Sequence, residues 1–161
     1  MRKIIPVLHN VTSPHRVVEF VTLAASLGFK NIVISKPSGS AAQMGVPQAF
    51  KAAIQLKANL IVLSDLSEIK ELLAIERMYF VLSPRYAEKK LVEEEFPPSK
   101  DIAVIFGGME PGITVREAEM GIKTHVGVPA TIGPVALAAI TLYLIRSKLV
   151  EWHPEHELSK D

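Results

Sequence analysis

Two acid–base side chains come after apolar runs of the sequence, at the points where strands would end. His9, followed by Asn10, comes after the run Lys3–Leu8, and Asp65 comes soon after the run Ala58–Leu63. A histidine has a pKa near neutrality and can act as a general base, although a lone histidine at a strand end is more often structural. Asp65 fits a turn or helix-capping residue better than a catalytic one. His9 is therefore the candidate base.

A glycine-rich loop is the second candidate for chemistry. The segment Gly107–Gly112 contains three glycines and a proline in six positions and directly follows the apolar run Asp101–Phe106. Because glycine has no side chain, the backbone of this loop can approach a ligand closely. Glu110 could accept two hydrogen bonds from a ribose, or its charge could favour a helix that starts near Thr114. The loop is either a ligand cradle or a tight turn.

Apolar runs typical of strands alternate with segments typical of helices along the chain. Such alternation predicts an α/β fold, a mostly parallel sheet with helices on both faces. A loop of small residues is expected at 35–42. The expected strands are residues 3–8, 31–34, 58–63, 78–82, 101–106 and 124–128, and the expected helices are residues 14–27, 47–57, a short helix capped at 64–68 and ending at 73, 85–96 and 134–148.

A second glycine-bearing loop, Pro129–Gly133, leads into an apolar helix that starts at Pro134. In open parallel sheets, ligands bind in the crevice outside the carboxyl ends of the strands. The two loops and this helix therefore predict a ligand site at the carboxyl edge of the sheet. The sequence has no Ser-His-Asp order, Walker loop, dinucleotide fingerprint or zinc pattern.

Composition narrows the class of protein. With 161 residues, 48% of them hydrophobic and 22% charged, we expect one globular domain over residues 1–150 and a polar tail over 151–161. The net charge of +1 gives no global field for nucleic acid, so binding would need a local basic patch. The absence of cysteine excludes disulfides, thiolate metal sites and cysteine nucleophiles. No metal site is expected, including at His153 and His156 in the tail.

Membrane segments and export signals are not expected. The apolar run at the N-terminus is short and is broken by Pro6, unlike a signal peptide. The longest apolar run, Val135–Ile145, is shorter than the roughly 20 residues that a membrane span needs. The sequence therefore predicts a cytoplasmic protein without a membrane partner.

The C-terminal third resembles a known family. The segments Val104–Ile113, Gly127–Pro129 and Val135–Tyr143 resemble the C-terminal half of SPOUT methyltransferases of the SpoU/TrmH type. The resemblance implies a C-terminal trefoil knot that holds the cofactor S-adenosylmethionine. On this resemblance the residues that bind the cofactor would be Leu82, Ser83, Phe106, Gly107, Gly108, Glu110, Val128, Pro129, Ile132 and Pro134.

The catalytic positions of that family are less well matched. Leu8–Pro14 resembles the opening of the family, but the helical arginine is absent, and Arg16 lies about a turn and a half earlier on the same helix. Arg16 is either its substitute or an ordinary surface arginine. The Ser-Leu-Asn motif is replaced by Ile132-Gly133-Pro134, and Glu110 stands one position later than in many members. The candidate catalytic residues are therefore His9, Asn10 and Arg16.

Three functional hypotheses follow. The first is an S-adenosylmethionine-dependent RNA methyltransferase that acts on a ribose 2′-hydroxyl of tRNA or rRNA. The second is a catalytically degenerate knotted protein that binds S-adenosylmethionine or RNA, and the third is an α/β protein that binds another small metabolite. The helix at 134–148 is apolar on more faces than one sheet can cover, which predicts a homodimer through this helix. A DNA partner is not expected.

Overall fold

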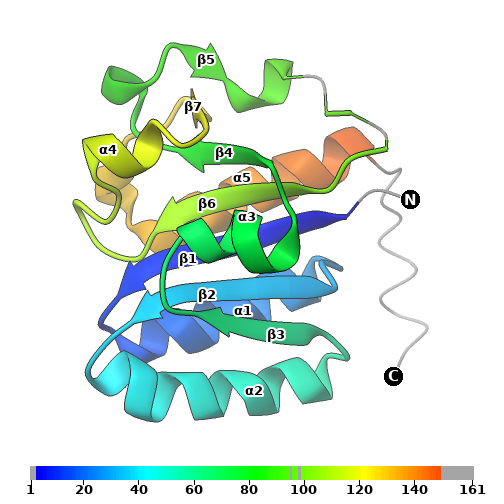
Figure 1. Ribbon diagram of the computed structural model, residues 1–161, viewed down its shortest axis with the longest axis vertical. Helices are drawn as coiled ribbons and strands as arrows, with labels where there is room; N and C mark the ends of the chain where they lie inside the picture. The colour runs from blue at the N-terminus through cyan, green and yellow to red at the C-terminus, as the bar shows by residue number, and fades with distance from the viewer. Residues whose placement is uncertain (1–2, 95, 98, 150–161) are drawn as a thin grey trace.

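The computed structural model of the chain describes residues 3–94, 96–97 and 99–149. Within them, seven strands form one sheet in the order β3-β2-β1-β6-β4-β7-β5 (Figure 1). Every pairing in it is parallel. The predicted tail at 151–161 lies outside the described residues. The strands are β1 (Ile4–Val11), β2 (Asn31–Pro37), β3 (Asn59–Leu63), β4 (Arg77–Val81), β5 (Lys89–Lys90), β6 (Ile102–Gly107) and β7 (Ile122–His125).

Helices cover both faces of the sheet, which confirms the predicted fold class (Figure 1). The helices α1 (Pro14–Ser26), α2 (Val46–Gln55) and α5 (Pro134–Leu149) contribute to the larger apolar cluster on one side. On the other side, α3 (Ser67–Leu73) packs into a second cluster. The one-turn helix α4 (Val115–Ala118) connects the end of β6 to β7.

The central strands are apolar without interruption because both of their faces are buried. Along β6, Val104 and Phe106 enter the larger cluster, whereas Ala103 and Ile105 enter the smaller one. Successive strand residues point to opposite faces, so a strand covered on both sides has no polar alternation. On the larger side, Phe106 meets Phe20 of α1 edge to face at 5.9 Å between ring centroids. This packing holds the carboxyl end of β6 in place.

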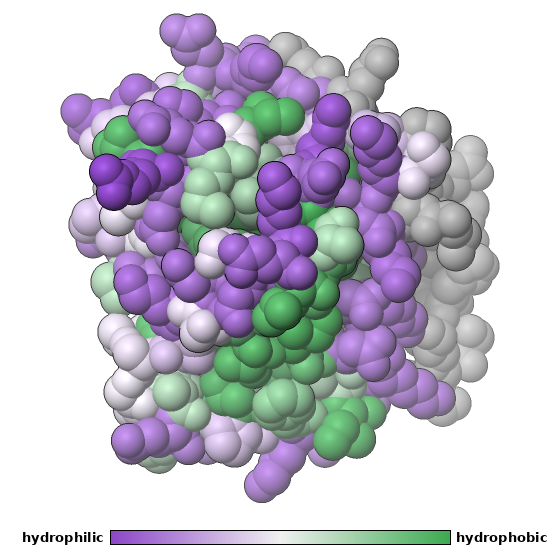
Figure 2. Space-filling model, in the orientation of Figure 1, coloured by the Kyte–Doolittle hydropathy of each residue, from purple (hydrophilic) through white to green (hydrophobic). Residues whose placement is uncertain are grey.

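The smaller side leaves apolar surface uncovered. Figure 2 shows apolar side chains gathered on this face over β2 and β3, beside α3. Leu72 of α3, on this side, is 66% exposed. The apolar composition of the chain is therefore visible at its surface as well as in its core.

The predicted helix at 85–96 is wrong. The segment contains 3-10 turns at Pro84–Tyr86 and Leu91–Glu93 on either side of β5. Lys89 and Lys90 pair with Thr124 and His125 of β7, so an edge strand replaces the helix. Pairing with a neighbouring strand overrides local helix propensity here.

Other boundaries shift by a few residues. Strand β2 continues to Pro37, and a π-helical turn begins at Ala41, so the loop expected at 35–42 is mostly structured. Strand β7 ends at His125, before Gly127, whose φ of +83° departs from a strand. None of the described helices is long and apolar enough to cross a membrane. The cytoplasmic location and the trefoil knot stay predictions.

Candidate metal centre at the carboxyl edge of the sheet

Four polar side chains from four parts of the chain meet at the carboxyl edge of the sheet. His9 lies near the end of β1, directly opposite Ser35 of β2 in the strand register. Asp65 follows the end of β3, and Glu117 belongs to α4, after β6. Because the strands are parallel, their carboxyl ends lie at one edge, and this topology brings the four residues together.

His9 makes a hydrogen bond with each of its ring nitrogens. Its side chain is 0% exposed. Nδ1 lies 2.9 Å from Ser35 Oγ, and Nε2 lies 2.6 Å from Glu117 Oε2. An ionised carboxylate only accepts hydrogen bonds. In the neutral ring, Nε2–H therefore donates to Glu117, and Nδ1 accepts the hydroxyl proton of Ser35.

Burial lowers the pKa of His9 below its ordinary value. The charge of Glu117 and its hydrogen bond act in the opposite direction, as does the charge of Asp65, whereas the positive charge of Lys36 adds to the lowering. The net direction is downward, so His9 is mainly neutral near pH 7. A neutral imidazole is the form that binds metal ions.

The two carboxylate oxygens of Glu117 have different partners. Oε1 accepts the backbone N–H of Thr114 at 2.9 Å, and the hydroxyl of Thr114 accepts the backbone N–H of Glu117 at 3.1 Å. This reciprocal capping box fixes the start of α4 and leaves Oε2 for His9. Burial alone would raise the pKa of Glu117, but these contacts with Thr114 and His9 lower it. Glu117 is therefore an anion at neutral pH.

His9, Asp65 and Glu117 fit a divalent metal ion. Each offers one ligand atom, and these atoms lie within 4.8 Å of one another. Metal–ligand distances of about 2.0–2.2 Å place donors on one ion roughly 3–4 Å apart, so a modest inward rotation would suffice. Asp65 is exposed and can supply that rotation. One imidazole and two carboxylates are a donor set that suits divalent metals.

The other two predicted catalytic residues hold the glycine loop. Arg16 Nη1 donates to the carbonyl of Gly108 at 3.0 Å, and Asn10 Nδ2 donates to the carbonyl of Gly112 at 3.3 Å. The backbone N–H of Gly108 donates to the carbonyl of His9 at 2.7 Å. The structure therefore brings all three predicted residues to one loop, and their catalytic roles stay predictions.

A cavity of about 360 Å³ shares the glycine loop and α4 with this centre. Half of the residues predicted to bind the cofactor line it: Leu82, Ser83, Gly107, Glu110 and Pro134. The other half are not among its lining residues: Phe106, Gly108, Val128, Pro129 and Ile132. Phe106 lies in the core, because its position on β6 points into the larger apolar cluster.

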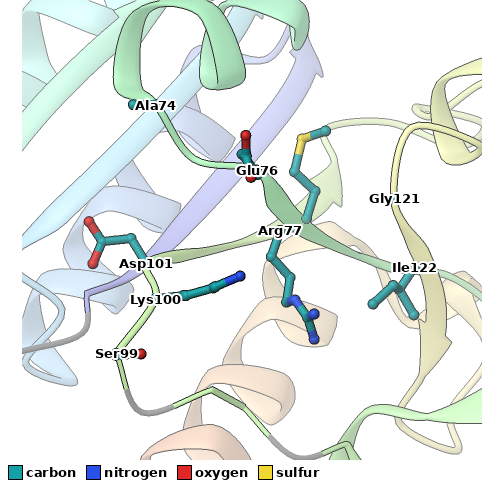
Figure 3. Close-up of a pocket in the computed structure, with 9 residues that line it drawn as sticks. Ala74, Glu76, Arg77, Ser99, Lys100, Asp101, Gly121 and Ile122 are labelled. Carbon is teal, nitrogen blue, oxygen red and sulfur yellow. The ribbon is translucent and has the colours of Figure 1, made fainter.

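A larger cavity, of about 520 Å³, lies at the opposite edge of the sheet. Figure 3 shows the side chains around it, which come from the amino ends of β4, β6 and β7. Its lining contains two cations, Arg77 and Lys100, and two carboxylates, Glu76 and Asp101. These charges balance and favour no ligand of one sign. None of the four residues at the carboxyl edge lines this cavity.

Sequence reasoning missed two members of the site. Glu117 lies in the pattern Thr114-x-x-Glu117, a capping-box signature directly after the glycine loop. This pattern could have been recognised, but α4 has only four residues, too few to show helical periodicity. Ser35 lies one residue beyond the strand that was predicted to end at Ile34, and no sequence signal marks it.

Sequence comparisons relate the chain to nucleases. Residues 39–144 match the family model described as "RecB-family nuclease (DUF2122)". The chain is 37% identical over 145 residues to "Putative type II restriction enzyme ApeKORF2002P" of Aeropyrum pernix, covering 89% of this chain and 92% of that protein. It is 31% identical over 149 residues to "Putative type II restriction enzyme MjaORF1200P" of Methanocaldococcus jannaschii, covering 92% and 100%.

Comparisons of structure relate the fold to methyltransferases. A structure described as "Structural insights into the 2-OH methylation of C/U34 on tRNA" matches with a TM-score of 0.74 and 15% identity, covering 94% of this chain and 99% of that chain. "Probable Methyltransferase from Bordetella pertussis Tohama I" matches with a TM-score of 0.71 and 16% identity, covering 92% and 95%. At such identities the similarity concerns the fold alone.

The sequence comparisons contradict the expected function. An S-adenosylmethionine-dependent RNA methyltransferase, its degenerate alternative and the cofactor itself all followed from the resemblance of the C-terminal loops. The family match and the two relatives point to a nuclease instead, and the metal-ligand cluster at His9 fits that chemistry. Because one fold supports many activities, the loops predicted the α/β architecture correctly and the chemistry wrongly.

Proposed function

The chain belongs to the family described as RecB-family nuclease (DUF2122), and we propose that it is a nuclease that depends on a divalent metal ion. His9, Asp65 and Glu117 hold the ion. The observation that carries this proposal is the convergence of their ligand atoms within 4.8 Å. They come from three separate segments and meet at the edge of the sheet where such folds bind ligands.

A bound divalent cation supplies Lewis-acid polarisation of a phosphoryl oxygen and lowers the pKa of bound water. The protein residues fix this chemistry in place. His9 is buried and Glu117 is held by its capping box, so two of the three donors are preorganised. Asp65 is exposed and completes the donor set from the solvent side. Its backbone N–H donates to Glu68 Oε1 of α3 at 2.8 Å, and its side-chain Oδ1 accepts the N–H of Leu66 at 2.8 Å.

Lys36 is placed to contact a phosphate of the substrate. It directly follows Ser35, is exposed, and contributes its charge to the electrostatics of His9. Contacts from lysine to backbone phosphates position nucleic acids without reading their sequence. A local cation at the centre offsets the lack of a strong positive charge over the whole chain, which is +1.

The substrate is nucleic acid, and the names of the two relatives favour DNA. The sequence had predicted RNA and no DNA partner. RNA is therefore the second substrate to be tested. The cavity of about 360 Å³ beside the centre could receive groups of either a DNA or an RNA substrate.

We also propose a homodimer through α5. Support comes from apolar side chains that this helix exposes, Ile140 at 37% and Tyr143 at 51%, and from Ile132 just before it at 40%. Exposed apolar groups that lie close together favour a protein contact.

A cleavage assay tests the proposed nuclease. Purified protein is incubated with plasmid DNA or with bulk RNA, in the presence of Mg²⁺ or Mn²⁺ or of a chelator. Cleavage should require the metal, and Glu117→Gln should lower the rate by about 100-fold or more. Glutamine can keep the capping box, so the variant should remain folded. Glu119→Gln is the matched control, because Glu119 is exposed at the end of α4 and lies outside the cluster.

The assay also separates the substrates. Cleavage of DNA alone supports DNA as the substrate. Cleavage of RNA alone would show that the substrate is RNA. Cleavage that persists in chelator, or equal rates for Glu117→Gln and the unmodified protein, would contradict the metal-dependent mechanism.

A further inference from the structure

We infer that Ser35 is a positioning residue that lets His9 exchange its ring proton between Nε2 and Nδ1 when a metal ion binds. The inference rests on the proposed metal centre and goes beyond it. It assigns a role to a buried hydroxyl that contributes no ligand atom to the cluster.

The hydrogen bond to Glu117 fixes one tautomer of His9. Nε2 lies 2.6 Å from the carboxylate of Glu117, which can only accept. The neutral ring must therefore carry its proton on Nε2. Nδ1 is then an acceptor, and the Ser35 hydroxyl at 2.9 Å donates to it.

Metal binding requires the opposite tautomer. Nε2 is the nitrogen that faces Glu117, so it is also the nitrogen that faces the other two ligands. To give its lone pair to an ion, Nε2 must lose its proton, which passes through the carboxylate of Glu117 to solvent. A ring that stays neutral must take up a proton from solvent on Nδ1 instead. Nδ1–H then needs a buried acceptor, because an unpaired buried donor costs about 1–3 kcal/mol.

A hydroxyl satisfies both tautomers without moving. It offers one O–H donor and two acceptor lone pairs, and the O–H rotates to suit its partner. Ser35 is itself 0% exposed and lies opposite His9 in the pairing of β1 with β2, so its Oγ stays in place. Within the described residues, the Ser35 hydroxyl has no hydrogen-bond partner besides His9. No competing contact fixes the direction of its O–H.

Two properties of Ser35 therefore follow from its place in the sheet. Removing the hydroxyl leaves Nδ1 unpaired in both states, and the loss is greater with metal bound, because a buried N–H is then orphaned. Outer partners of ligating histidines typically contribute about 10–100-fold in metal affinity. Ser35→Ala should lower affinity by that factor, and Ser35→Thr, which keeps a hydroxyl on the same carbon, should restore it.

The test uses nuclear magnetic resonance of histidine ring nitrogens labelled with the heavy nitrogen isotope. In the metal-free protein, the protonated nitrogen of His9 should be Nε2. After addition of Zn²⁺, which is diamagnetic, it should be Nδ1. The His9→Gln variant identifies the signals that belong to this ring among the histidines of the chain.

Calorimetric titration with Zn²⁺ supplies the second readout. The affinity should fall about 10–100-fold in Ser35→Ala and return in Ser35→Thr. Ser38→Ala is the control, because Ser38 is exposed just beyond the same strand and should bind Zn²⁺ as the unmodified protein does. Circular dichroism of Ser35→Ala checks that it is folded, and the nitrogen signals of the unmodified protein test the proposal without any variant.

Each outcome decides the inference separately from the function. If Zn²⁺ binds and the proton stays on Nε2, His9 is not a ligand, and both the role of Ser35 and the proposed donor set are refuted. If the proton moves to Nδ1 but Ser35→Ala binds with unchanged affinity, the role of Ser35 is refuted and the metal centre stands. If the proton moves as expected but no nucleic acid is cleaved, the inference stands and the nuclease proposal falls. If the unmodified protein binds no metal, both fall.

Discussion

At the scale of single residues, His9 is a buried imidazole whose pKa lies below its ordinary value because of burial. An unfolded histidine titrates near pH 6.5, so below about that pH the unfolded state binds more protons than the folded state. Above about pH 6.5, His9 is neutral in both states and the free energy of unfolding keeps its full value. As the pH drops from there through the lower pKa of the folded state, the free energy of unfolding should fall.

Urea denaturation of the metal-free protein between about pH 7.5 and pH 5 measures this dependence. His9→Gln should flatten the decrease, because glutamine does not titrate. His15→Gln is the control, since His15 is exposed on α1. Equal slopes for the unmodified protein and His9→Gln would show that His9 does not cause the loss.

Lys36 combines a strained backbone with a charge at the centre. Its φ of 52° is in the left-handed region, where a side chain costs about 1–2 kcal/mol. Lys36→Gly should therefore leave the free energy of unfolding unchanged or raise it by up to about 1 kcal/mol, while it weakens substrate binding and raises the KM for nucleic acid. Strain at functional positions is retained for what the side chain does there.

Lys57 provides a matched control for this change. It has the same residue type and a φ of 57°, and it lies after α2, away from the carboxyl-edge cluster. Lys57→Gly should change stability to a similar extent without any effect on KM. If Lys36→Gly and Lys57→Gly raise KM to the same extent, the contribution of Lys36 to substrate binding is disproved.

At the scale of elements, the glycine loop couples the end of β1 to α4. A Cβ built on Gly108 would stand 2.6 Å from Cβ of Val11 and 2.7 Å from the carbonyl oxygen of Asn10. Backbone cannot yield at such distances, so Gly108→Ala should displace the loop and lower the free energy of unfolding by about 1–3 kcal/mol. Metal affinity should fall too, because α4 carries Glu117.

Gly39→Ala separates crowding from backbone conformation. Gly39 has nothing within 4 Å of a built Cβ, but its φ is +58°. Its substitution should cost only about 1 kcal/mol and leave metal affinity unchanged. Urea denaturation and calorimetry of both variants give the comparison. A larger loss of stability for Gly39→Ala would mean that the close approach at Gly108 is unimportant.

Local signals predicted several elements well. The helix α1 begins where its apolar segment predicts: Ser13 caps it through a hydrogen bond from the N–H of Arg16, with Pro14 in the first turn. The buried strands were recognisable because their apolar runs are continuous. The segment around Lys89 and Lys90 was not, because its strand exists only through pairing with β7, a contact that charge patterns do not encode.

The candidate site was only partly predictable for a related reason. His9 was a candidate because it follows a strand, and Asp65 was interpreted as a turn or cap. Their relation to Glu117 depends on which strand ends are neighbours in the sheet, and no spacing along the chain reveals that order. The position of β6 beside β1 brings α4 to His9. Sheet order, rather than sequence spacing, makes the cluster.

At the scale of the whole molecule, the fold resembles methyltransferase structures while the sequence relates the chain to nucleases. Parallel sheets present loops and strand ends at their carboxyl edge, and different side chains there support different reactions. The functional conclusion therefore rests on His9, Asp65 and Glu117, not on the architecture that carries them.

The proposed homodimer is also a property of the whole molecule. Light scattering at micromolar concentration should give twice the chain mass of 17.7 kDa. Tyr143→Asp should shift the protein toward a monomer, because a charge on α5 would be desolvated in the contact. Leu72→Asp is the control, since Leu72 is exposed on the uncovered face beside α3. A monomer before mutation, or dissociation by Leu72→Asp instead, would contradict the contact through α5.

The metal centre itself is tested most directly by calorimetric titration of the unmodified protein with Mn²⁺. We expect one ion per chain, with affinity lowered by at least about tenfold, or 1.4 kcal/mol, in Asp65→Asn and in Glu117→Gln. Glu119→Gln should bind as the unmodified protein does. An absence of binding, or the same affinity in all four proteins, would show that His9, Asp65 and Glu117 do not form a metal site.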